Sequence, residues 1–158
     1  MANTQAMTTS FMGELMTATH NFGTAPVRAT GATDSFKAAL YLDSATMNAS
    51  TTAYTVTGEV SGTGYSAGGV AVTFGTPPTA TNSSTTAGVA FVTPSASITY
   101  TTVTLTTAFD AVLIYNSTQS DKAVSVHTFG SQTITAGTFT LTMPANTTST
   151  ALIRLATT

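Results

Sequence analysis

The feature that most constrains the fold is a strict alternation of residue types near the C-terminus. In Thr138–Met143 every second residue is a threonine, and the residues between them are Phe139, Leu141 and Met143. Successive side chains of a β-strand point to opposite faces, so this period of two predicts a strand with one buried face and one solvent face.

Three other short apolar runs share the region 109–155 and are separated by turn-forming residues. The runs are Ala111–Tyr115, Ala123–Phe129 and Ala151–Leu155, and the turn formers are Asn116–Ser120, Gly130–Ser131, Ala136–Gly137 and Pro144–Asn146. Ala111–Tyr115 is apolar on both alternations, which is typical of a strand covered on both faces. We therefore predict an antiparallel meander that forms the folding core, with Leu113, Val126, Phe139 and Leu141 buried together.

Further strands are expected upstream, with turn signals at short and regular spacing. The candidate strands are 35–42, 54–60, 70–74, 87–93 and 98–106. Many short strands of this kind indicate an all-β protein, an antiparallel β-sandwich or jelly-roll-like fold. We predict one short N-terminal helix over 11–18, capped by Ser10, a polar N-terminal arm over 1–9, and a single β-sandwich domain over 10–158.

The composition is unusual in its shortage of charge. Charged residues make up 6% of the 158 residues, whereas about 25% is usual, and there are 39 threonines. Threonine favours strands, and its side chain tolerates both water and a packed neighbour. The surface should therefore be mainly hydroxyl and methyl groups, which suits a protein packed against others; a monomeric, threonine-rich β domain is the plainer alternative.

Charge and hydropathy argue against several classes of function. Four basic residues and a net charge of −2 are too few to neutralise a run of phosphates, so we expect no nucleic-acid partner. No apolar stretch approaches the roughly 20 residues of a membrane-spanning helix, and the N-terminus lacks the pattern of a secretory signal. There is no cysteine, which excludes disulfides and thiolate metal sites.

One short motif matches the G-x-S-x-G pattern of serine hydrolases. It is the segment GYSAG at 64–68, in which Ser66 would be the nucleophile, and Asp110 and His127 could fill the triad order. A nucleophile elbow requires a helix directly after the serine, but Gly69 and the strand-forming run VAVTF follow here. We therefore interpret the segment as a glycine-rich bend and predict that the protein is not an enzyme.

Dinucleotide and metal sites have equally little support. Gly62, Gly64 and Ala67 echo the dinucleotide fingerprint, but that motif also needs a βαβ unit. The two histidines, His20 and His127, are far from each other in sequence and from any ligand partner. A Ca²⁺ site that uses Asp43, Asp110 or Asp121 is an open alternative. We predict no cofactor and no catalytic residue.

Seven blocks of sequence, taken in order, resemble a family of small virion proteins of tailed phages. The blocks are HNF (20–22), FKAALYLDSATMNASTTAYT (36–55), GEVSGTGYSAGG (58–69), AVLIYN (111–116), AVSVHTFG (123–130), AGTFTLTMP (136–144) and ALIRL (151–155). The resemblance covers most of the chain from residue 10 onward. Members often carry a tryptophan-containing segment before AVLIYN, where this chain has TPSASITYTTVTLTT.

The resemblance implies a structural role in the virion. The expected function is that of a capsid decoration (cement) protein on the outer capsid surface, made in the host cytoplasm. Its partners would be the major capsid protein and further copies of itself, as a homodimer or homotrimer, with no nucleic acid and no membrane. The alternatives are a collar, tail or fibre-base component and a carbohydrate-binding β-sandwich. The family supplies no catalytic residues.

Overall fold

The computed structural model describes residues 3–8, 11, 15, 19–20, 22, 34–81 and 88–156. These residues form an all-β protein with antiparallel strands, which confirms the predicted fold class. The strands are β1 (Ala6–Met7), β2 (Phe36–Leu42), β3 (Val70–Val72), β4 (Thr79–Ala80), β5 (Val89–Val92), β6 (Ile98–Asn116), β7 (Lys122–Leu141) and β8 (Ile153–Ala156).

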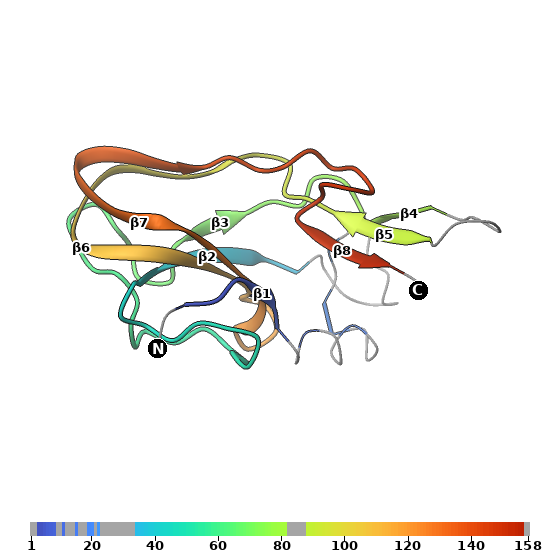
Figure 1. Cartoon of the computed structure of the whole chain (residues 1–158), viewed down its shortest axis with the longest axis horizontal. Helices are drawn as coiled ribbons and strands as arrows, with labels where there is room; N and C mark the ends of the chain where they lie inside the picture. The colour runs from blue at the N-terminus through green and yellow to red at the C-terminus, as the bar shows by residue number, and fades with distance from the viewer. Residues whose placement is uncertain are drawn as a thin grey trace.

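Two sheets share these strands (Figure 1). The larger sheet has five strands in the order β1-β7-β6-β2-β3, and the smaller has three in the order β4-β5-β8. The smaller sheet lies at one end of the long axis, beside the C-terminus (Figure 1). Because β6 is the central strand of the larger sheet, its segment Ala111–Tyr115 is buried on both faces, as the sequence predicts.

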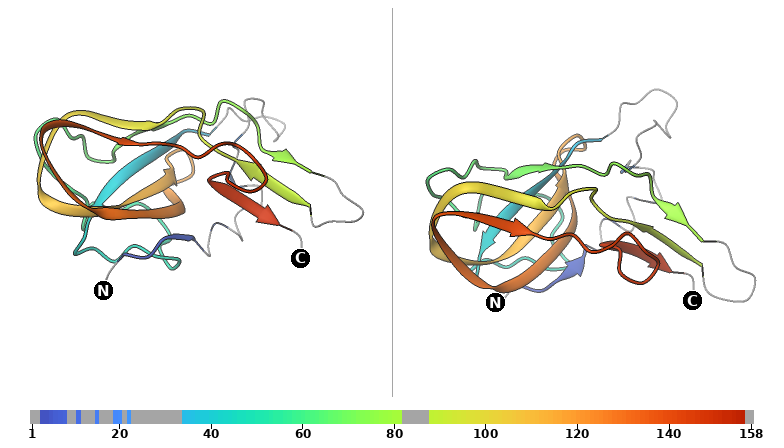
Figure 2. Two further views of the ribbon diagram at one scale, coloured as in Figure 1. Left: turned by 45° about the horizontal axis from the view of Figure 1, so that its top comes forward. Right: turned by 90° about the horizontal axis from the view of Figure 1, so that it is seen from above.

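The β6–β7 ribbon dominates the fold. Its strands are 19 and 20 residues long, and the ribbon bends back on itself so that two limbs face each other (Figure 2). We call the pairing of Ala111–Asn116 with Lys122–Thr128 the lower limb and that of Ile98–Leu105 with Ile134–Leu141 the upper limb. The hydroxyl of Tyr100 in the upper limb donates to the carbonyl of Ala38 in β2 (2.8 Å) and so joins the two layers.

The bend is produced by β-bulges, and here the predicted meander is wrong. Gly130–Ser131 and Ala136–Gly137 do not end strands; they lie inside β7, where the pairing register with β6 shifts. Ala136 has φ +47° and Thr102, at the opposing shift in β6, has φ +53°. Each bulge adds an extra residue to one strand and increases the local twist, so a series of them folds a continuous ribbon over.

The last predicted strand of the meander belongs to the other sheet. β8 starts at Ile153 and pairs with β5 through Val92↔Ile153 and Ala90↔Leu155. The turn-rich segment after Met143 therefore carries the chain away from β7 rather than back along it.

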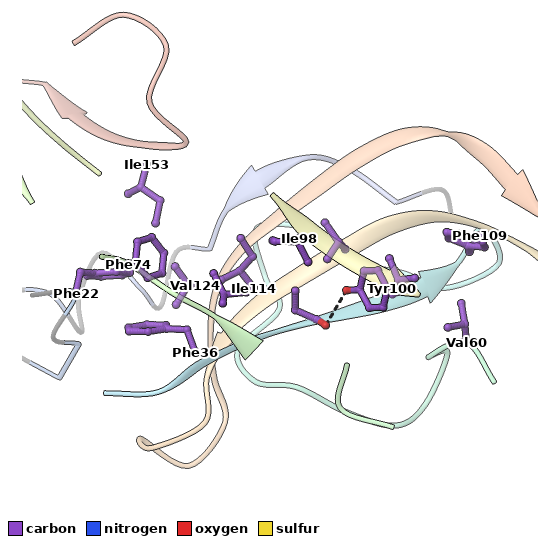
Figure 3. Close-up of a cluster of buried hydrophobic side chains, with 14 of the residues drawn as sticks. Phe22, Phe36, Val60, Phe74, Ile98, Tyr100, Phe109, Ile114, Val124 and Ile153 are labelled. Carbon is purple, nitrogen blue, oxygen red and sulfur yellow. Dashed lines mark hydrogen bonds between the residues drawn. The ribbon is translucent and has the colours of Figure 1, made fainter. Parts of the chain in front are cut away.

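Apolar side chains form two clusters, one on each face of the larger sheet. The larger cluster lies between the two limbs and includes an aromatic group made by Phe22, Phe36 and Phe74 (Figure 3). The smaller cluster is covered by the loop after β2 and includes Leu113 and Val126.

The expected common core is thereby corrected. Leu113 and Val126 are buried in the smaller cluster, whereas Phe139 and Leu141 are half-buried and pack against the larger one. The side chains of the two pairs point to opposite faces of the larger sheet, as successive side chains of a strand do, so the sheet lies between them.

Three upstream predictions have different outcomes. β2, β3 and β5 lie where strands are predicted, but 54–60 is a loop with isolated bridges at Ala53 and Glu59 rather than a strand. Most of the predicted helix 11–18 lies outside the described residues, and the two that are described, Phe11 and Leu15, are helical.

The predicted N-terminal arm lies against its own domain over residues 3–8. β1 pairs with β7 through Ala6↔Val126 and Met7↔Ser125. The side-chain amide of Asn3 donates to the carbonyl oxygen of Leu42 and to Asp110.

Candidate functional site

Ser66, the formal nucleophile, lies in an exposed turn. Its carbonyl accepts from the amide of Gly69 (2.9 Å), and Gly68 has φ +85°, which is the conformation a type II turn requires. A side chain at Gly69 would collide with the carbonyl oxygen of Ala38, so this position needs glycine for close approach to β2. The strand β3 follows this turn, at the place where a nucleophile elbow would require a helix.

Asp110 and His127 are engaged elsewhere. The Nε2 of His127 lies 2.9 Å from the hydroxyl of Ser125 on the same strand, and Asp110 accepts from Asn3. Burial lowers the pKa of His127 to about 4, so the ring is neutral at pH 7. Among the described residues, no hydrogen bond joins Ser66, Asp110 and His127.

The glycines of the dinucleotide-like motif contact protein backbone. A side chain at Gly62 or Gly64 would strike the carbonyl oxygen of Thr104 or Thr102 in β6. Thr63 forms an isolated bridge with Thr104, and the amide of Thr104 donates to the carbonyl of Thr63 (2.8 Å). The motif thus attaches a loop to the upper limb.

The structure reveals a cluster that the sequence analysis missed, centred on the buried carboxylate of Glu59. One oxygen accepts from the Tyr54 hydroxyl (2.7 Å), and the other from the Tyr65 hydroxyl and the Gly68 amide (both 2.7 Å). Glu59 is 8% exposed. Three donors compensate for the loss of water, so a buried carboxylate is accommodated here.

All five tyrosines of the chain gather around this carboxylate. Tyr115 donates to the Gly68 carbonyl (2.8 Å) and stacks on Tyr54, Tyr65 stacks on Tyr100, and Tyr41 donates to the Thr55 carbonyl. Burial raises the pKa of every one of them, that of Tyr54 to about 12. The cluster fastens the loop after β2 to the larger sheet with tyrosines in the neutral form.

A second buried polar group joins three distant parts of the chain. The side-chain amide of Asn116 donates to Asp34 (2.8 Å) and lies 3.1 Å from Nδ1 of His20, and Gln119 also donates to Asp34 (3.0 Å). The carbonyl oxygen of Asn116 accepts from the amides of Thr118 and Gln119. These bonds organise the β6–β7 turn.

The carboxylates of the proposed Ca²⁺ site do not form a ligand set. Asp110 lies in the interior of β6 with Asp43 beside it, where the amide of Asp43 donates to the carbonyl of Ala108, whereas Asp121 lies in the β6–β7 turn beyond the end of that strand. In the described part of the chain, no three His, Asp or Glu residues are placed to hold a metal ion.

The outer face of the upper limb is a surface of threonines. Exposed threonines alternate with buried or half-buried apolar residues on both strands: Thr99, Thr101 and Thr102 on β6, and Thr135, Thr138 and Thr140 on β7. Neither 98–107 nor 128–143 contains a charged residue. This surface is the strongest candidate for a functional site, and its chemistry is that of contact rather than catalysis.

No family model, curated protein or solved structure matches the chain. Among the residues described, no helix is long and apolar enough to cross a membrane.

Proposed function

We propose that this chain is a structural protein of a tailed-phage particle and acts as a capsid decoration protein. It binds the outside of the head and bridges neighbouring copies of the major capsid protein. The observation that supports this most is the threonine surface of the upper limb, a charge-free area on a rigid antiparallel ribbon. The sequence blocks that resemble virion proteins point to the same role.

The physical basis is the low cost of covering this surface. Burial of a charged side chain costs free energy unless a partner compensates it, and this surface has none to bury. Threonine methyl groups gain from leaving water, while the hydroxyls exchange hydrogen bonds with a partner. Binding of this kind depends on area and shape.

A collar, tail or fibre-base component is the second candidate and has the same surface requirements. Copy number separates the two, because a head lattice offers many more equivalent positions than a tail. The carbohydrate-binding alternative has less support. Binding sites for sugars display exposed aromatic rings, whereas the five tyrosines here are committed to the Glu59 cluster and there is no tryptophan.

Quantitative mass spectrometry of purified particles tests the proposal. Hundreds of copies per particle are expected for a decoration protein, and a few dozen or fewer would favour the tail candidate. Absence from washed particles would overturn both.

A salt wash of the same particles tests the mode of binding. Exposed ion pairs contribute about 0–1 kcal/mol each and are screened by salt, but apolar association is not weakened by it. The protein should remain bound when ionic strength rises from about 0.1 to 1 M, a range over which the Debye length falls from about 10 to 3 Å. Release by NaCl alone would contradict binding through this surface.

A further inference from the structure

The outer edge of β7, the edge that faces away from β6, has a neighbour in the lower limb but none among the described strands in the upper limb. In the lower limb the outer edge of β7 is covered by the chain itself: β1 pairs with Ser125 and Val126, and the amide of Ala123 donates to the carbonyl of Thr52. In the upper limb β6 is the only neighbour of β7 among the described strands. Its outer edge therefore presents backbone N–H and C=O groups from every second residue.

This edge also lacks the features that usually prevent strand pairing. Natural edge strands carry charges, prolines or bulges that block a second strand. Thr128–Met143 has no charge and no proline. Its last extra residue is at Ala136, and the register shift opposite Gly137–Phe139 places its extra residue on β6, where Thr102 has a positive φ. Thr138 and Thr140 are exposed, and Phe139 and Leu141 are only half-buried.

The same stretch is complementary to itself. In an antiparallel pair of two copies centred on Thr140, Thr138 lies opposite Thr142, and Phe139 lies opposite Leu141. Threonines then meet threonines on the outer face, as Thr99 and Thr140 already do within one molecule (Oγ1 to Oγ1 3.5 Å), and apolar residues meet on the inner face. The bulge at Ala136 and the proline at 144 flank the centre at equal spacing and define this register.

We propose that the outer edge over Gly137–Met143, formed by the end of β7 and the two residues after it, is a homodimer interface, in which two copies pair antiparallel about a two-fold axis at Thr140. The upper limbs then join into one four-stranded sheet in the order β6-β7-β7-β6. A second copy fits this edge better than a charged partner because it brings no charge against a charge-free strand and repeats the same alternation. The dimer does not depend on the proposed place in the virion, so its failure would leave the copy-number test unaffected.

The first experiment measures the oligomeric state of the full-length protein by sedimentation velocity from about 1 to 100 µM, a range suited to micromolar dissociation constants. A dimer is expected. Thr140→Lys and Thr140→Glu should each raise the dissociation constant at least about 100-fold, since two like charges meet at the axis. An equimolar mixture of the two variants should restore dimers, which also shows that both are folded.

The matched control is Thr99→Lys, which adds the same charge to the facing residue of β6, away from the edge. It should dimerise like the unmodified protein. A double variant tests the register: Thr138→Lys with Thr142→Glu should dimerise, whereas lysine at both positions should not.

Four results would overturn the proposal. They are a monomer over the whole concentration range, a trimer, dimerisation of Thr140→Lys at unchanged affinity, and equal loss of dimers in Thr99→Lys. Failure of Thr138→Lys/Thr142→Glu to dimerise would overturn the two-fold axis at Thr140.

Discussion

The lower and upper limbs are built from the same two strands but have opposite relations to solvent. In the lower limb every residue of Ala111–Asn116 is buried, with apolar clusters on both faces. In the upper limb exposed threonines alternate with apolar residues, and only the inner face is packed. A single strand can thus be a core element over one half and a surface over the other. The two halves differ at every second position, where the lower limb has buried residues and the upper limb has exposed threonines.

The outer faces of the two limbs also differ in what covers them. The loop after β2 covers the outer face of the lower limb, where Tyr54 stacks on Tyr115 and Glu59 holds the tyrosines. No described segment covers the outer face of the upper limb. Substitutions at four positions and one change of pH test this contrast between the limbs.

Leu113→Ala should have the largest effect, because Leu113 is fully buried in the lower limb. Truncation of a buried leucine leaves a cavity and costs about 2–5 kcal/mol of unfolding free energy. Chemical denaturation measures this loss. A loss below about 1 kcal/mol would mean that the lower limb is not the core the contrast assumes.

Glu59→Ala should cost about 2–3 kcal/mol, because the hydroxyls of Tyr54 and Tyr65 and the Gly68 amide would lose their acceptor. Glu59→Gln keeps an oxygen and about the same volume, so it should cost less. The same denaturation experiment compares the two variants. Equal losses would show that the charge matters and the shape does not.

Acidification should destabilise the protein through His127, which lies on β7 close to the bend. Its pKa is about 4 in the folded protein and 6.5 in an unfolded chain, so the unfolded state binds the proton first. The stability contribution of the neutral ring is present above pH 6.5 and is lost as pH falls toward 4, by up to about 3 kcal/mol.

Thermal unfolding measured across this pH range reports the loss. His127→Gln is the control and should flatten that part of the profile. An unchanged slope in the variant would assign the acid sensitivity to other groups, such as the carboxylates.

Phe139→Ala should have a moderate effect of about 1–2 kcal/mol. A fully buried phenylalanine costs about 3–5 kcal/mol when truncated, but Phe139 is half-buried, although its ring lies beside those of Tyr100, Phe109 and Phe129. Its unfolding free energy should be measured below the dimerisation concentration. A loss as large as that of Leu113→Ala would erase the contrast between the limbs.

Thr138→Ala should change the stability of the monomer by no more than about 0.5 kcal/mol, as is usual for exposed positions. The measurement is the midpoint of denaturation at low protein concentration. A larger loss would indicate that the threonine surface stabilises the monomer itself.

The strand positions were largely predictable from sequence, whereas their connections were not. Alternation is a local property, so Phe36–Leu42 and Thr138–Leu141 are recognisable without knowledge of their partners. Glycine, serine and alanine allow both a turn and a bulge, and only the length of the opposing strand decides between them. Gly130–Ser131 therefore resembles a turn until β6 is known to continue beside it.

The Glu59 cluster could not have been predicted by the same means. Its hydroxyls come from residues 41 to 115, and their spacing follows no period of a strand or helix. One weak signal existed: Glu59 is an acid within a long stretch that has no other charge between Asp43 and Asp110. An isolated charge in such a sequence is a candidate for burial with dedicated partners.

The pairing of β1 with β7 has a consequence for the order in which the chain folds during synthesis. Ala6 and Met7 leave the ribosome before their partners Val126 and Ser125, which are made more than a hundred residues later. Contacts between such distant positions form slowly, because a long loop must close before they contribute. β1 therefore pairs with the larger sheet only after β7 has been made and the ribbon has bent.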